Sequence, residues 1–404
     1  MTALDSVSLA LLALSTLVFL AGVALVALIH SRYHLDIVVR PEGQAAPGPA
    51  EPLPLISVIV PARNEARNIR RCAGALLAQD YPHFELIVVD DRSSDGTGAL
   101  LAALQAGAGG RLRVVQGAEL PPGWAGKPHA LHQGVGQARG EWLCFVDADT
   151  FAAPALLSAA RRAAREQGAD MLSLLTGQEL ESFWERAVLP LVFTALSFGF
   201  PARRVNDPAR PEAIANGQFI LIRREAYEAV GGHQAVRDRI AEDLALAQRV
   251  KGGGFRLIVA DGRELARTRM YTSLAEIWEG WTKNIFIGMQ GRLGLLLFGV
   301  LVGLFGALGL PAWLVGAALW LPAALRAGSG AAWVPALVLL QALGLWAYLL
   351  WQRARAAQAF GLSPLYAFTF PAGALLFTAM MLASAGMVLS GRGVTWKGRR
   401  YGFR

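Results

Sequence analysis

The sequence predicts an α/β domain with a mostly parallel sheet, joined at both ends to apolar helices that cross a membrane. Strand and helix patterns alternate from Ile56 onward, as they do in proteins with parallel sheets. Long uncharged runs lie on either side of this region. The 404-residue chain is only 17% charged, whereas an ordinary soluble protein has about 25% charged residues.

The predicted elements of the domain follow one another closely. Ile56–Val60 and Glu85–Val89 are short apolar runs typical of buried strands, and Ala66–Gln79 between them has apolar residues at helical spacing. A further helix is expected from Thr97. Two more strands are expected at Arg113–Val115 and Trp142–Val146. Ligands of such sheets bind beyond the carboxyl ends of the strands, so the polar clusters that follow these strands should meet in one crevice.

The N-terminal run Val7–Ile29 has no charged residue and would be about 35 Å long as a helix, enough to span a bilayer. A cleaved signal peptide would begin with basic residues and have a shorter apolar core. Here Asp5 precedes the run, and Arg32 and Arg40 follow it. We therefore expect a retained anchor in residues 1–32 and a cytoplasmic domain after it.

Residues 293–391 contain three long uncharged stretches, and the second and third each fit one spanning helix. The first, Leu293–Leu325, has Pro311 in its middle. It fits either one long helix with an interfacial lead-in or a hairpin of two short helices. The basic tail, residues 392–404, favours the cytoplasm. Four C-terminal spans would place it there and three would not, so we expect three to four spans and favour the hairpin.

Four further segments complete the predicted organisation. Residues 33–55 are expected to be a linker, since the stretch Pro41–Pro54 is rich in Pro, Ala and Gly, and residues 56–270 are expected to form the globular domain. Residues 271–292 carry aromatic and apolar residues at helical spacing, which is typical of an interfacial amphipathic helix. Inside the domain, Ala187–Pro201 is apolar but too short to span a bilayer. It is expected either in the membrane interface or as a buried core helix.

The net charge of +8 does not indicate a nucleic-acid partner, because the positive residues flank membrane segments and suit anionic lipid. The two cysteines, Cys72 and Cys144, do not form a zinc-type cluster. A cytoplasmic domain also argues against a disulfide between them.

Asp147-Ala148-Asp149 is the strongest candidate for a metal site. The two carboxylates directly follow a buried strand, where uncompensated charge is unfavourable. Their hard oxygen atoms suit Mg²⁺ or Mn²⁺, which usually completes its coordination shell with substrate phosphates. A turn or a helix cap is the alternative interpretation of such a pair.

Five runs in this order resemble the motifs of family 2 glycosyltransferases with the GT-A fold. They are VIVPARNEARNI, VVDDRSSDGT, GKPHALHQG, FVDADT and AEDLALAQRV. The resemblance extends from about Ile56 to Asn284. The membrane ends and the closing VTWKGRRY resemble a narrower membrane-bound subgroup associated with hopanoid and carotenoid biosynthesis.

The resemblance implies a nucleotide-sugar donor site. The loop after the first strand would wrap the base and ribose through Pro61, Arg63, Asn64 and Glu65. Asp91 would accept a hydrogen bond from uracil, and Lys127 would meet the diphosphate as a point charge. Asp149 would bind the cation directly, with Asp147 nearer the ribose or a metal-bound water. Gln218 would contact the sugar. Polar helix caps, a solvated loop lysine and a turn are the alternatives.

The resemblance also implies a general base. Asp243 of the pair Glu242-Asp243 would take the proton from the acceptor hydroxyl, and the direct displacement would invert the anomeric carbon. N-terminal helix capping by acids is the alternative. Processive family members carry QxxRW near residue 281, and this chain does not. Trp281 and Lys283 would contact the acceptor there.

The sequence therefore predicts a cell-membrane enzyme that moves one sugar, most simply from a UDP-hexose, to a membrane lipid with the help of Mg²⁺ or Mn²⁺. Hopanoid, carotenoid, sterol-like and glycerolipid acceptors all fit. The alternatives are a processive polysaccharide synthase and a non-catalytic membrane scaffold that binds a sugar nucleotide. Product length distinguishes the first alternative, and binding without turnover would indicate the second.

Overall fold

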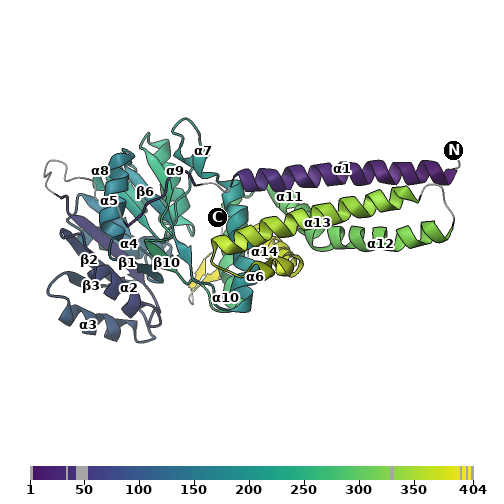
Figure 1. Ribbon diagram of the computed structural model, residues 1–404. Coiled ribbons are helices and arrows are strands. Elements are labelled where there is room, and N and C mark those ends of the chain that lie inside the picture. Colours follow the sequence, from purple (N-terminus) through teal and green to yellow (C-terminus); the bar gives the residue numbers. More distant parts are fainter. Residues whose placement is uncertain are drawn as a thin grey trace. The chain divides into compact units, whose positions relative to one another are not determined.

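The computed structural model describes residues 3–32, 35–41, 53–327, 332–391, 394–396 and 399–401. The chain divides into two compact units, each assembled from segments that are far apart in the sequence (Figure 1). The α/β unit comprises Leu35–Glu179, Phe200–Tyr271 and Gly393–Arg404, and the helical unit comprises Met1–His34, Leu180–Gly199 and Thr272–Arg392.

The α/β unit is built on a seven-stranded sheet of order β3-β2-β1-β4-β8-β6-β9. Its strands are β1 Ile56–Ala62, β2 Phe84–Asp90, β3 Leu112–Gln116, β4 Trp142–Phe145, β6 Met171–Leu175, β8 Ile220–Arg223 and β9 Leu257–Asp261. Only β8 runs against its neighbours, β4 and β6. Because β1 is parallel to both β2 and β4, the carboxyl ends of these three strands lie at one edge. The predicted mostly parallel α/β fold is confirmed.

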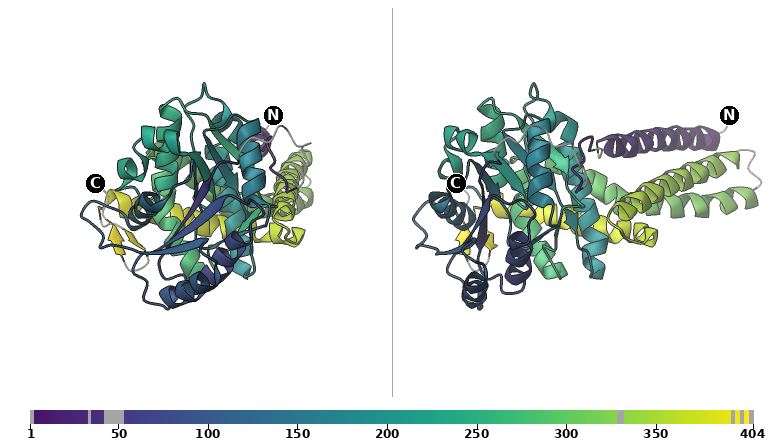
Figure 2. Two further views of the ribbon diagram at one scale, coloured as in Figure 1. Left: turned by 90° about the vertical axis from the view of Figure 1, so that its left-hand side faces the viewer. Right: turned by 60° about the vertical axis from the view of Figure 1, so that its left-hand side comes forward.

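Helices cover both faces of this sheet, so its strands are apolar on both sides (Figure 2). One apolar cluster contains residues of α2 (Ile69–Leu77), α3 (Thr97–Gly107) and α5 (Leu156–Glu166). The other contains residues of α4 (Gly126–Gln137), α8 (Arg224–Ala229) and α9 (Glu242–Gly252). Along β1, Val58 and Val60 belong to the first cluster and Ile59 to the second.

Smaller elements complete the α/β unit. They are the sheet of β5 Thr150–Ala152, β10 Ala266–Thr268 and β7 Gly177–Gln178, the helices α7 Ala202–Asn206 and η1 Gly232–Val236, and the hairpin of β11 Val394–Trp396 and β12 Arg399–Tyr401. Residues 35–41 also belong to this unit. Val39 N donates a hydrogen bond to Asp261 O at 2.8 Å, and the Val39 side chain is buried. Most of the predicted linker, residues 42–52, lies outside the described residues, as do Arg392, Lys397 and Arg404 of the predicted basic tail.

The helical unit contains every stretch of the described chain that is long and apolar enough to cross a membrane: Ser6–Ser31, Leu293–Arg326, Trp333–Ala359 and Pro364–Leu389. Its elements are α1 Ala3–Ser31, α6 Phe183–Gly199, α10 Leu274–Gly288, α11 Leu293–Leu304, the π-helical η2 Phe305–Gly309, α12 Leu310–Arg326, α13 Trp333–Ala359, the 3-10 helix η3 Pro364–Thr369 and α14 Phe370–Leu389. The apolar stretch predicted at Ala187–Pro201 is thus mostly α6.

The hairpin favoured within Leu293–Leu325 is wrong, because the chain from Leu293 to Arg326 is one continuous helical run. Pro311 lies in the first turn of α12, directly after the π-helical residues Phe305–Gly309. Proline lacks the N–H that would bond one turn back, and a π-helical turn already breaks that hydrogen-bond spacing. One N-terminal and three C-terminal apolar helices are therefore present. The boundaries between the predicted segments stay predictions.

Gly134 allows α4 to lie close to the sheet. A Cβ atom added at this position would be 2.5 Å from Ile59 Cγ2 and 3.2 Å from Val89 Cγ2. These are branched side chains of β1 and β2, which cannot swing away as the end of a long side chain does. The approach matters because α4 carries Lys127 in its first turn.

We expect Gly134→Ala to destabilise the protein by about 1–3 kcal/mol, because its methyl group overpacks the core. Gly136→Ala is the matched control in the same helix, where an added Cβ meets nothing within 4 Å. It should raise stability by up to about 1 kcal/mol, since alanine favours the helix. Thermal unfolding of the detergent-solubilised variants compares them. Equal midpoints would contradict the close packing of α4 on β1.

Candidate functional site

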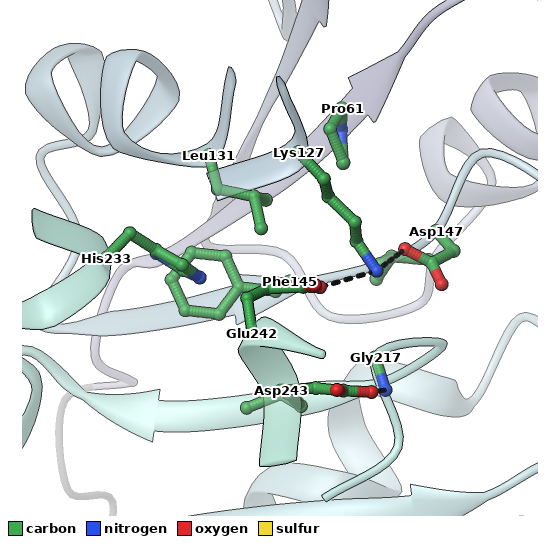
Figure 3. Close-up of a pocket in the computed structure, with 11 residues that line it drawn as sticks. Pro61, Lys127, Leu131, Phe145, Asp147, Gly217, His233, Glu242 and Asp243 are labelled. Atoms are coloured by element: carbon green, nitrogen blue, oxygen red, sulfur yellow. Dashed lines mark hydrogen bonds and ion pairs between the residues drawn. The ribbon is translucent and has the colours of Figure 1, made fainter. Parts of the chain in front are cut away.

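A small pocket lies at the carboxyl edge of β1 and β4 (Figure 3). It is lined by residues of β1, α4, β4, β8, η1 and α9, and by the backbone of the turn before β8. The lining residues are Pro61, Lys127, Leu131, Phe145, Val146, Asp147, Gly217, Ile220, His233, Glu242 and Asp243. The fold thus brings together five residues predicted for the site: Pro61, Lys127, Asp147, Glu242 and Asp243.

Lys127 joins two of the acids in this pocket. Its Nζ lies 2.7 Å from Asp147 Oδ1 and 2.8 Å from Glu242 Oε1. Figure 3 shows the ammonium between the two carboxylates. Asp147 follows β4, Glu242 opens α9, and Lys127 comes from the first turn of α4. Two ion pairs therefore fix three elements that are far apart in the sequence.

The pocket has more carboxylates than cationic side chains. Its lining residues include Lys127 and the three acids Asp147, Glu242 and Asp243. Burial of Lys127 disfavours its charge, but the three carboxylates outweigh this and hold its pKa well above the ordinary value. Burial raises the pKa of Glu242 to about 7, with a smaller contribution from Asp243, although Lys127 acts against the rise. An excess of carboxylate favours the binding of a further cation.

The adjacent acids Glu242 and Asp243 occupy different environments. Glu242 is only 3% exposed and is paired with Lys127. Asp243 is half-buried, and its two oxygens accept backbone hydrogen bonds, Oδ2 from Gly217 N at 3.0 Å and Oδ1 from Leu244 N at 2.8 Å. These bonds fix the orientation of a carboxylate that lines the pocket. The bond to Leu244 also supports the start of α9, so the predicted capping role and a chemical role are compatible.

Gly217 lies where the charged groups converge. A Cβ atom added there would be 2.8 Å from Lys127 Nζ, 3.1 Å from Asp243 Oδ2 and 3.5 Å from Asp147 Oδ2. A side chain at this position would occupy the space between the three groups. The sequence pattern predicts the neighbouring Gln218 for the site and not Gly217, although both belong to the turn Asn216-Gly217-Gln218.

His233 forms part of the apolar wall and was not predicted. Its Nδ1 lies 2.8 Å from the Tyr227 hydroxyl, and its ring packs edge-on against Phe145 at 4.8 Å. Burial, with a smaller contribution from Lys127, lowers the pKa of His233 to about 3, so the ring is neutral. A single histidine after two glycines gives no sequence pattern that would have identified it.

The loop after β1 is bound to the loop after β2. Arg63 Nη1 donates to Asp91 O at 2.7 Å, Ser94 N donates to Asn64 Oδ1 at 2.9 Å, and Glu65 N donates to Thr97 Oγ1 at 2.8 Å. The side chain of Asp91 is buried nearby. These residues therefore gather at the same sheet edge as the pocket, but of this loop only Pro61 lines it.

Four other predicted residues do not line the pocket: Asp149, Gln218, Trp281 and Lys283. The buried amide of Gln218 accepts a hydrogen bond from Asn216 Nδ2 at 3.1 Å and another from the Thr176 hydroxyl, which turns it toward β7. Trp281 and Lys283 lie on α10 in the helical unit. Trp281 is 7% exposed and packs edge-on against Phe193 of α6.

The acidic residues after β4 fit a divalent cation that arrives with phosphate. Asp147 and Asp149 are half-buried on either side of the buried Ala148 and offer hard oxygen donors. Within the described part of the chain, no group of three or more His, Cys, Asp or Glu side chains could hold a metal ion. A cation held by two aspartates completes its shell with oxygens of another molecule, as Mg²⁺ does with substrate phosphates.

Residues 57–231 match the model of "Glycosyl transferase family 2". The 4,4'-diaponeurosporenoate glycosyltransferase of Staphylococcus aureus (strain MRSA252) is 29% identical over 257 residues, which cover 63% of this chain. The match spans 66% of that relative, just under two thirds of its length.

Two solved structures are similar in fold. Mannosyltransferase PcManGT from Pyrobaculum calidifontis, in complex with GDP-Man and Mn²⁺, has a TM-score of 0.49 and 20% identity, and the similarity covers 96% of this chain and 99% of that chain. S. aureus TarS 1-349 in complex with UDP-GlcNAc has a TM-score of 0.40 and 20% identity, with coverage of 58% and 66%.

We expect Lys127→Met to destabilise the protein, because it leaves the buried Glu242 beside two other acids without a cation. The loss should be about 1–3 kcal/mol, reduced by screening because a third of the Lys127 side chain is exposed. It should grow from pH 6 to pH 8. A carboxyl whose folded pKa is raised binds more protons than in the unfolded chain, so stability falls as pH rises from the ordinary value of 4.5 to the folded pKa. Lys127 acts against the rise in the pKa of Glu242, so in its absence this fall extends to higher pH.

Thermal unfolding at both pH values measures this loss. The double variant Lys127→Met with Glu242→Gln is the matched control, since the neutral amide needs no counter-ion. It should recover most of the lost stability and show less pH dependence. Failure of Glu242→Gln to rescue Lys127→Met at pH 8 would contradict the coupling of the two side chains.

Proposed function

We propose that this protein, whose residues 57–231 match the model of "Glycosyl transferase family 2", transfers a single sugar from a nucleotide-sugar, a UDP-hexose, to a lipid embedded in the membrane. The reaction is metal-dependent and inverts the anomeric carbon. The observation that supports this most strongly is the gathering of Lys127, Asp147, Glu242 and Asp243 at the carboxyl edge of a mostly parallel sheet, where ligands of such sheets bind.

In this proposal the donor diphosphate lies between Lys127 and the two aspartates after β4. Asp149 would hold the cation directly, and Asp147 would support it or the ribose. A divalent cation held there would supply positive charge against the negative charge that builds on the leaving diphosphate. Lys127 adds a second positive charge to the same oxygens. The assignment of uridine to Asp91 and of the ribose to the loop Pro61–Glu65 follows the family resemblance of these motifs.

Asp243 is the general base in this mechanism, and Glu242 is a positioning residue. Asp243 lines the pocket with a carboxylate oriented by Gly217 N and Leu244 N. It takes the proton from the acceptor hydroxyl as that oxygen forms its bond to the anomeric carbon. The bond from that carbon to the diphosphate oxygen breaks on the opposite side, and the nucleoside diphosphate leaves. Glu242 is buried and paired with Lys127, which it holds toward the donor site.

The membrane helices support a lipid acceptor. Four stretches of the described chain are long and apolar enough to span a bilayer, and the relative from S. aureus is named a 4,4'-diaponeurosporenoate glycosyltransferase. A hydroxyl or carboxyl of a hopanoid, carotenoid or glycerolipid fits this setting. Trp281 and Lys283 on α10 are proposed acceptor contacts. The missing QxxRW motif favours transfer of one sugar over polymer synthesis. We place the protein in the cell membrane with its α/β unit in the cytoplasm.

Membranes containing the protein should transfer label from radiolabelled UDP-glucose to an extracted lipid only when Mn²⁺ or Mg²⁺ is present. Asp149→Ala should lower this transfer by at least about 100-fold, because the charge on the leaving group is no longer neutralised. Lipid extraction and chromatography measure it. If UDP-glucose, UDP-GlcNAc and GDP-mannose all leave lipids unlabelled, a non-catalytic scaffold becomes the better interpretation.

Asp243→Asn should reduce transfer at least about 1,000-fold while donor binding stays within a few-fold of the native value, since it removes a base that acts on the acceptor. Glu242→Gln is the contrasting variant, because loss of a positioning residue should weaken donor binding as well as turnover. Single-turnover transfer and UDP binding separate the two. Normal turnover by Asp243→Asn would show that another group is the base.

A further inference from the structure

The points where the chain passes between the two units limit how often it crosses the membrane. The chain passes from the α/β unit into the helical unit after Tyr271. It stays in the helical unit through residues 272–392, and the hairpin of β11 and β12 that follows belongs to the α/β unit. A compact folded unit lies on one side of a bilayer, so this segment must cross an even number of times. It nevertheless contains three stretches long enough to cross. One of the three therefore does not.

Helix α13 is a crossing helix, because it runs parallel to α1. Ser15 Oγ donates to Gln341 Oε1 at 2.5 Å, and a Cβ atom added at Gly22 would be 2.6 Å from Leu345 Cδ2. The residue numbers of the contacting pairs rise along both helices, so α1 and α13 are parallel. The end of α1 leads directly into the α/β unit, so α13 also runs toward the side of that unit.

Helix α12 is the second crossing helix. It packs along α13 and is joined to it by the short segment between Arg326 and Trp333. The two therefore form an antiparallel pair. Figure 1 and the right-hand view of Figure 2 show α1, α12 and α13 extended side by side. This leaves α14 as the apolar helix that does not cross.

Helix α14 packs against α10 and α6. Its Ser384 Oγ accepts a hydrogen bond from Phe286 N of α10 at 3.0 Å, and a Cβ atom added at Gly373 would be 2.7 Å from Ala187 O of α6. Helix α6 starts and ends next to segments of the α/β unit and has 17 residues, about 25 Å, so it does not cross either. In Figure 1, α14 is seen nearly end-on while α13 runs along the page.

We propose that α14 lies along the membrane face together with α6 and α10, and that the chain crosses the bilayer three times, through α1, α12 and α13. The partner of this three-helix surface is the boundary between lipid headgroups and acyl chains. The proposal concerns the membrane arrangement and does not depend on the proposed transferase activity.

The side chains of α14 and η3 fit this placement. One stripe of large exposed apolar residues recurs every seven positions, which is one helix face: Phe368, Leu375, Leu382 and Leu389. The opposite face is buried within the helical unit through small and medium residues: Gly373, Ala374, Thr378, Met381, Ser384 and Ala385. No charged residue occurs between Arg355 and Arg392. A helix that is apolar all round is stable here because protein covers one face and acyl chains cover the other.

The placement also agrees with the distribution of positive charge. Three crossings put the basic tail on the same side as the α/β unit and the basic flank of α1, as the positive-inside rule requires. Arg353 and Arg355 near the end of α13 lie toward the same side. An in-plane α14 therefore satisfies this rule without a hairpin in Leu293–Leu325.

Single cysteines at Ser31, Ala327, Ser363 and Ser390 test the proposal, because all four positions are exposed and the native Cys72 and Cys144 are buried. A membrane-impermeant maleimide is applied to intact cells and to inverted vesicles. Ser363→Cys and Ser390→Cys flank η3 and α14 and should react from the same side as Ser31→Cys. Ala327→Cys, at the end of α12, should react from the other side. Labelling of Ser363→Cys and Ser390→Cys from opposite sides would overturn the proposal.

A depth measurement gives an independent test. Nitroxide labels at Leu375, Leu382 and Leu389, one per variant, report their depth in vesicles of phosphatidylcholine and phosphatidylglycerol by oxygen and nickel accessibility. A crossing helix would separate Leu375 from Leu389 by about 21 Å of depth. An in-plane helix should keep the three labels within a few ångströms of one depth. A steady gradient along the three positions would refute the in-plane placement.

Discussion

The pair of contacts that Lys127 makes with Asp147 and Glu242 is the interaction on which the site depends. A half-buried ammonium at 2.7 and 2.8 Å from two carboxylates holds the start of α4, the end of β4 and the start of α9 together. Without it, three acids would share a pocket with low solvent access, and the buried one would take up a proton. The same charge is available to a diphosphate, so stability and the proposed donor binding rest on one side chain.

The position of Lys127 follows from packing elsewhere. Gly134 lets α4 approach β1 and β2, which places the first turn of that helix over the carboxyl edge of the sheet. Gly217 leaves the space in front of the ammonium open. Asp243 keeps its direction through two backbone amides, while the adjacent Glu242 is occupied by the lysine. These different contacts of the two adjacent acids support the proposed roles of Asp243 as the general base and Glu242 as a positioning residue.

The sequence predicted the α/β fold and most of the charged pocket, because parallel strands end at one edge and the motifs follow those strands. The sequence did not predict in which direction individual side chains point. The Gln218 side chain points toward Thr176, and its amide oxygen accepts hydrogen bonds from Thr176 and Asn216. The spacing of residues in the sequence does not predict this orientation. Pro311 favours a break in the sequence pattern, but it lies in the first turn of α12, after π-helical residues where the α-helical hydrogen-bond spacing has already changed. The roles of Arg63, Asn64, Glu65, Asp91, Trp281 and Lys283 stay predictions.

An experimental structure of the whole protein with UDP and Mn²⁺ would test the proposed donor site. We expect a manganese peak within bonding distance of an Asp149 oxygen and a diphosphate oxygen within hydrogen-bond distance of Lys127 Nζ. The nucleotide base should lie at the loops after β1 and β2. A nucleotide bound elsewhere, with Lys127 still held between Asp147 and Glu242, would contradict the account.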